Sequence, residues 1–70
     1  MAEVRAEMVA NVWKEVAAEG HQVAEGDILV ILESMKMEIP VLAEEAGVVT
    51  KMHVTEGDVV QEGDLIAVIS

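Results

Sequence analysis

The second half of this 70-residue chain repeats the first, and this repeat constrains the fold more than any other feature. Residues 19–32 (EGHQVAEGDILVIL) align with residues 56–69 (EGDVVQEGDLIAVI) at a constant offset of 37 positions. Each copy carries a Glu-Gly turn, a short apolar step, a Glu-Gly-Asp turn and an aliphatic run. Glycine accepts positive φ without steric cost and aspartate hydrogen-bonds nearby backbone, so both turns favour chain reversal. Two halves built alike predict a pseudo-two-fold fold.

The aliphatic composition predicts an all-β fold. Apolar residues make up 53% of the chain, with one aromatic residue, Trp13, and no cysteine. Branching at Cβ stiffens valine and isoleucine and favours pleated sheet. Residues 4–16 fit a helical face as well as an alternating strand. The second copy, residues 48–54, is more clearly strand-like, so we expect the first copy to be strand too.

The pattern predicts one domain, residues 1–70, with eight strands. Many short strands with regular turn signals are typical of a sandwich or flattened barrel. Pro40 falls in an expected strand and therefore belongs at a sheet edge, where its missing N–H is not needed. We expect strands near residues 3–9, 11–17, 28–33, 37–42, 47–54 and 65–69, with short strands near 22–24 and 59–61.

The acidic charge argues against two classes of partner. A formal net charge of −10 disfavours nucleic acid, which normally requires a basic face, and also anionic membrane surfaces. No apolar run approaches the roughly 20 residues of a membrane-spanning helix, and the first residues lack the basic and apolar regions of a signal peptide. We therefore expect a cytoplasmic protein that is a monomer when isolated.

The segment between the two copies is not explained by the repeat. Residues 32–40 (LESMKMEIP) have strand-like ends and polar residues in the middle, which predicts a hairpin with Lys36 at or near its tip. The usual hairpin signals, Asn-Gly or Asp-Gly, are absent. An arbitrary loop lysine is usually just solvated, and methionines usually fill the core. A turn between Met35 and Met37 nevertheless exposes apolar groups, which calls for a reason.

Residues 33–38, ESMKME, resemble the attachment motif of the biotin/lipoyl attachment domain family, in its free-standing biotin carboxyl carrier type. The resemblance extends over essentially the whole chain, because the Glu-Gly and Glu-Gly-Asp turns match as well. It implies a flattened barrel of two four-stranded antiparallel sheets, with Lys36 at a hairpin tip carrying covalent biotin. It also implies that Met35 and Met37 flank the recognition site, and it makes Glu33, Ser34 and Glu38 candidate contacts of the ligase.

The resemblance implies a carrier that catalyses nothing itself. The resemblance also implies that a biotin protein ligase biotinylates Lys36 and that the swinging biotin carries a carboxyl group between biotin carboxylase and carboxyltransferase sites. The chain departs from many carrier subunits of this kind in three ways. It lacks a Pro/Ala-rich linker and a protruding thumb, and it has Ser34 where alanine is usual, which leaves the partner carboxylase open.

Three rival functions stay open at this point. A lipoyl carrier, or a dual biotin/lipoyl acceptor, has the same fold, but lipoyl motifs place an acidic residue before the lysine and a small one after it, where this chain has Met35 and Met37. An enzyme using Lys36 as a Schiff-base nucleophile needs a desolvated amine, which a hairpin tip does not offer. A plain β interaction module without modification is the third.

The remaining polar candidates are expected to be structural. Asp27 and Asp64 occupy equivalent repeat positions and are interpreted as turn residues rather than paired catalytic carboxylates. The chain has no cysteine that could bind a metal ion together with His21 or His53, so no metal site is predicted. Trp13 is expected to lie in the core or to cap an edge rather than to serve as a binding platform. No catalytic residue is predicted, since Ser34 also lacks a base nearby in the sequence.

Overall fold

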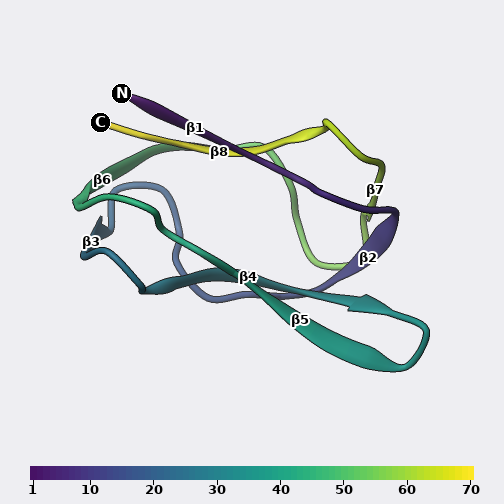
Figure 1. The fold of residues 1–70 in the computed structure, drawn as a ribbon. Coiled ribbons are helices and arrows are strands. Elements are labelled where there is room, and N and C mark those ends of the chain that lie inside the picture. Colours follow the sequence, from purple (N-terminus) through teal and green to yellow (C-terminus); the bar gives the residue numbers. More distant parts are fainter.

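The computed structural model describes all 70 residues, Met1–Ser70, as strands and turns without a helix. Two antiparallel sheets of four strands each, in the orders β1-β8-β6-β3 and β5-β4-β2-β7, pack into a flattened barrel (Figure 1). The all-β class, the two four-stranded sheets and the strand assignment near the N-terminus are confirmed. The strands are β1 Ala2–Arg5, β2 Ala10–Glu15, β3 Gln22–Val23, β4 Ile28–Ser34, β5 Met37–Leu42, β6 Gly47–Met52, β7 Val59–Val60 and β8 Leu65–Ile69.

The two halves of the barrel are equivalent at the same offset of 37 residues. Strand β2 begins and ends 37 residues before β6, and β3 stands in the same relation to β7. The ladder registers match too, because Lys14 pairs with Ile31 and Lys51 with Val68. Each half also supports the other: the N–H of Glu15 donates to the Glu56 carboxylate (3.2 Å). The N–H of Met52 donates to the Glu19 carboxylate in the equivalent bond (3.0 Å).

The core between the sheets is entirely aliphatic. Sixteen residues are buried and none of them is polar or charged. Both halves contribute equivalent members, such as Leu29 and Ile66, each with 0% of its surface exposed. Burying a leucine or isoleucine side chain contributes about 1.5–3 kcal/mol, so this layer supplies the rigidity on which the hairpin stands. The largest fully buried side chains are those of Leu29, Leu32, Ile66, Ile69, Val12, Val30, Val49 and Val60.

Several strands are shorter than expected. The strand predicted for 3–9 ends at Arg5, and those predicted for 11–17 and 47–54 span Ala10–Glu15 and Gly47–Met52. Ala6 ends the first one, because its N–H donates to the Asp64 carbonyl and its carbonyl accepts from the Gly63 N–H. The chain there binds a turn of the other half instead of continuing the ladder. The short strands are two residues long rather than three.

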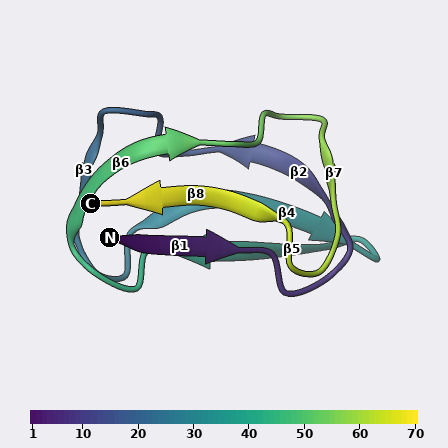
Figure 2. The same cartoon turned by 90° about the horizontal axis from the view of Figure 1, so that it is seen from above.

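The long hairpin β4–β5 points away from the two chain ends. Strands β1 and β8 run side by side, with Ala2 paired with Ile69, so both termini lie together (Figure 2). The β4–β5 loop extends from the opposite end of the molecule, whose long axis measures 31 Å (Figure 1). Strand β5 is a sheet edge, which confirms the edge position predicted for Pro40. No helix able to cross a membrane is found.

Candidate functional site

A two-residue loop forms the tip of the β4–β5 hairpin. Ser34 pairs with Met37, which leaves Met35 and Lys36 as the loop. Both loop residues have positive φ, 53° and 64°, the backbone of a type I′ turn, which normally selects Asn-Gly. A non-glycine residue in this left-handed region costs about 1–2 kcal/mol. The ladder from Ser34–Met37 down to Ile28–Leu42 holds the strained tip in place.

The loop presents its side chains to solvent. Met35 is 88% exposed and Met37 60% exposed, and Lys36 is exposed between them. Lys36 takes part in no salt bridge, because the one ion pair of the structure joins Arg5 to Glu3. Both cavities of the structure lie elsewhere and neither is lined by Lys36. An accessible, unpaired primary amine suits acylation by an enzyme that encloses it, and it does not suit Schiff-base catalysis, which needs desolvation.

The other motif residues lie in the two strands directly below the loop. Glu33 and Glu38 are exposed and stand opposite one another in the ladder. Ser34 is half-buried and stands opposite Met37. The structure therefore brings all six residues of the motif together around the tip, with Met35 and Lys36 in the loop itself.

The other two lysines occupy a different environment. Lys14 and Lys51 are equivalent residues of β2 and β6, and each of these strands is flanked by a strand on both sides. Their backbone is thus paired within a sheet, and an enzyme cannot wrap around it. Lys14 also lies over the Trp13 ring, with Nζ 5.9 Å from the ring centroid. Only Lys36 stands on a free loop.

The polar residues expected to be structural make local turn contacts. Asp27 Oδ2 accepts from the Ala24 N–H (2.8 Å), and Asp64 Oδ2 accepts in the same way from the Gln61 N–H (2.9 Å). This bears out their interpretation as turn residues. No three His, Asp or Glu side chains are grouped so that they could hold a metal ion.

His21 has a turn role that the sequence reasoning missed. Its Nδ1 accepts from the Ala18 N–H at 3.3 Å. At the equivalent position of the other half, Asp58 Oδ2 accepts from the Thr55 N–H at 2.9 Å. The signal was present in the repeat, since the offset of 37 aligns His21 with Asp58.

The prediction for Trp13 was wrong. Trp13 is 47% exposed, and its strand β2 lies between β4 and β7 rather than at an edge. The ladder shifts register between Val12 and Lys14, so Trp13 is the extra residue of a β-bulge. Alternation from the buried Val12 directs Trp13 to the outer face of the sheet, and the bulge keeps Lys14 on that face as well.

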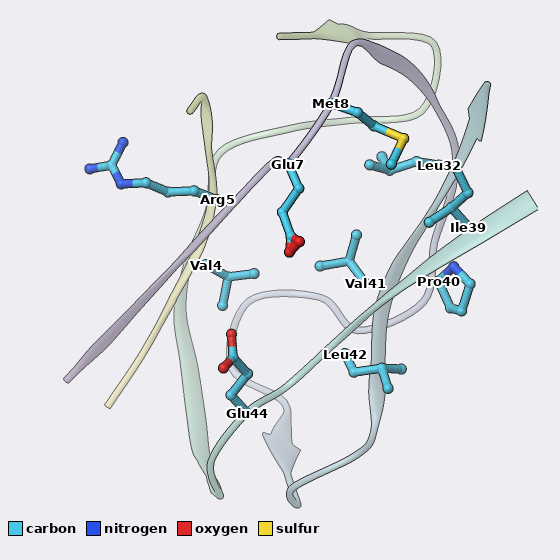
Figure 3. A pocket seen from close by; sticks show the side chains of 10 residues that line it. All are labelled: Val4, Arg5, Glu7, Met8, Leu32, Ile39, Pro40, Val41, Leu42 and Glu44. Atoms are coloured by element: carbon cyan, nitrogen blue, oxygen red, sulfur yellow. The ribbon is translucent and has the colours of Figure 1, made fainter. Parts of the chain in front are cut away.

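An apolar cleft of about 230 Å³ opens between the edge strands β1 and β5 (Figure 3). Its walls are equivalent in the repeat, since Val41 and Glu44 lie 37 positions after Val4 and Glu7. The cleft thus lies where β1 and β5, the equivalent edge strands of the two sheets, face each other without backbone pairing. It is a consequence of the symmetric closure and is separate from the hairpin tip.

Fold and site together define the class: a small β-barrel scaffold that presents one lysine on a free hairpin loop. A family model described as "Biotin-requiring enzyme", the biotin/lipoyl family, matches residues 2–69. The chain belongs to this family.

Individual relatives point the same way. The chain is 66% identical over 68 residues to the "Biotinylated protein TB7.3 homolog" of Mycobacterium leprae, covering 97% of this chain and 96% of that protein. It is 43% identical over 67 residues to the "Biotin/lipoyl attachment protein" of Bacillus subtilis, covering 96% and 92%. The solved urea carboxylase of Kluyveromyces lactis contains a similar domain, with a TM-score of 0.92 and 42% identity over 99% of this chain and 6% of that one. These likenesses support a role as a biotin carrier.

Proposed function

We propose that Lys36 carries biotin in an amide bond made by a biotin protein ligase. The observation that carries this proposal is the exposed, unpaired amine of Lys36 on a two-residue loop. The Lys36 nitrogen forms a bond to the carboxyl carbon of activated biotin as AMP leaves, and the amine gives up its proton. The acylated side chain is neutral, which takes the formal net charge from −10 to one unit lower.

The hairpin keeps the attached group mobile and away from the barrel. The lysine stem and the valeryl chain together span roughly 12–14 Å by ordinary bond lengths. The group supplies the capacity to carry a carboxyl unit, and the tether raises its effective concentration at every site that the arm reaches. We propose that these sites belong to a biotin carboxylase and a carboxyltransferase. Met35 and Met37 provide adaptable apolar contacts for the enzymes that enclose the tip.

Ligase incubation followed by intact-mass measurement tests the proposal. With biotin, ATP and a biotin protein ligase, the chain is expected to gain the mass of one biotinyl group. Lys36→Arg is expected to gain none, because a guanidinium stays protonated and is no acyl acceptor. Lys14→Arg and Lys51→Arg are the matched controls and are expected to load as the wild type does. Equal loading of Lys36→Arg contradicts the assignment.

A lipoyl carrier, or a dual acceptor, is the second candidate. It is favoured by the fold and by the relative described as a biotin/lipoyl attachment protein. The methionines on both sides of Lys36 favour biotin in this chain. Loading with lipoate and a lipoate ligase under matched conditions separates the two, and we expect the biotinyl adduct to form faster.

A further inference from the structure

Because the two sheets are equivalent in the repeat, the residues on the outer face of one sheet can be compared, position by position, with those on the outer face of the other. On the outer face of the hairpin sheet, Pro40 pairs with Ile31, and the bulge at Trp13 lies next along the same row. The equivalent row of the other sheet contains Glu3, Val68 and Thr50. The two rows make the same backbone pairs, including the bulge, and each contains a lysine, Lys14 paired with Ile31 and Lys51 paired with Val68. At the other three positions, only the hairpin sheet is apolar throughout.

The fold does not require an aromatic side chain at position 13. Thr50 fills the equivalent bulge, and its Oγ1 donates to the Val68 carbonyl at 3.2 Å. Trp13 is the only aromatic residue of the chain and is nevertheless 47% exposed. Tryptophan is strongly enriched among the residues that dominate binding energy at protein interfaces. The one aromatic side chain is thus half-exposed on the outer face, with the Lys14 ammonium 5.9 Å from its ring centroid, and it is available for a contact with another protein.

An acidic pair lies between this row and the hairpin tip. Glu33 and Glu38 are directly opposite one another and lie two residues nearer the tip, on the same face as Ile31 and Pro40. Like charges placed directly opposite are destabilising, and neither carboxylate is in a salt bridge. Once Lys36 is acylated, the cation at the tip is lost. The loaded end then presents two carboxylates and no positive charge, which complements a basic surface.

We propose that the outer face of the β5-β4-β2-β7 sheet docks the loaded carrier on its biotin carboxylase. This Trp13 face is defined by Trp13, Ile31, Pro40, Glu33 and Glu38. The partner has an apolar pocket for the indole, with basic side chains opposite the two glutamates. The proposal rests on the function proposed above. The carboxylase is favoured over the ligase because it meets the loaded form, in which the charge of Lys36 is absent.

Kinetics with the loaded carrier as the varied substrate test this docking face. The full chain and its Trp13→Thr variant are biotinylated, checked by intact mass and supplied to the purified biotin carboxylase subunits of the same organism. ADP release is measured with ATP and bicarbonate. Trp13→Thr copies the residue of the equivalent bulge, so the fold is retained. Its KM is expected to rise about tenfold or more, with kcat unchanged. Val48→Thr, which exchanges a methyl group of an exposed valine of the other sheet for a hydroxyl, is expected to leave KM unchanged.

A second readout detects the contact directly. Incorporation of 5-fluorotryptophan gives a single ¹⁹F resonance, because the chain has one tryptophan. This resonance is expected to shift or broaden when the carboxylase is added to the loaded chain, and to stay unchanged when the ligase is added. A KM for Trp13→Thr within twofold of wild type, an equal rise in Val48→Thr, or a response to the ligase alone overturns the docking face. Failure of the wild type to load overturns instead the proposed attachment of biotin.

Discussion

Replacing the strained tip by an Asn-Gly turn is expected to stabilise the protein while it removes the acceptor. Met35 and Lys36 adopt φ values of 53° and 64° without being glycine or asparagine. Asparagine tolerates this region and glycine enters it without a penalty. The double variant Met35→Asn/Lys36→Gly therefore keeps the loop geometry and removes most of the strain.

The magnitude follows from the two backbone conformations. Each left-handed residue costs about 1–2 kcal/mol of stability. The added glycine offsets part of this gain, because it destabilises the fold by about 0.5–1 kcal/mol through the greater entropy of the unfolded chain. If both penalties are removed, the net gain in the free energy of unfolding is about 1–3.5 kcal/mol. For a domain of this size, each kcal/mol raises Tm by about 4–8 °C.

Thermal unfolding followed by far-ultraviolet circular dichroism measures this gain. The matched control is Lys51→Gly, the same kind of change inside β6, which is expected to lower the stability by about 0.5–1 kcal/mol. Opposite signs for the two glycine substitutions support the strained loop. A double variant with an unchanged or lower Tm refutes it.

Two further substitutions test the symmetry of the scaffold. Gly47→Ala places a Cβ 2.6 Å from the Ser70 carbonyl oxygen and 2.8 Å from Ile69 Cγ2, so the urea midpoint is expected to fall by the equivalent of about 1–3 kcal/mol. The equivalent Ala10 already has a Cβ, and Ala10→Gly is expected to cost no more than about 1 kcal/mol; an unchanged Gly47→Ala midpoint speaks against the close approach. His21→Asp copies Asp58 and is expected to match or exceed the wild-type stability, whereas His21→Ala loses about 0.5–1.5 kcal/mol with the turn hydrogen bond. An Asp variant less stable than the Ala variant rules out the shared turn role.

Most strands of the scaffold could be predicted because the sequence contains two similar copies, and the clearer copy indicates the structure of the other. The clearer strand pattern of residues 48–54 decided between helix and strand for residues 4–16, and the structure places β2 and β6 at the same offset. The early end of β1 could not be predicted, because alternation continues past Arg5. What stops the strand is the pair of hydrogen bonds between Ala6 and the turn at residues 63–64, a long-range contact that has no local signal.

The hairpin tip was located by its motif, but its backbone conformation was not foreseen. The expected turn signals are absent at Met35 and Lys36, and the left-handed conformation is imposed by the ladder on both sides of the loop. Trp13 was misplaced because the one large aromatic side chain of a small chain was expected to be buried, although alternation from the buried Val12 places it on the outer face. The bulge changes the alternation only beyond Trp13, where it keeps Lys14 exposed.

Mass mapping of the protein purified from its own cells tests the central claim most directly. The intact mass gives the number and kind of adducts, and peptide fragmentation assigns the modified residue among Lys14, Lys36 and Lys51. We predict one biotinyl group, located on Lys36. A lipoyl mass on Lys36 contradicts the choice of cofactor, and an adduct on Lys14 or Lys51, or none on any lysine, contradicts the assignment of Lys36 as the attachment site.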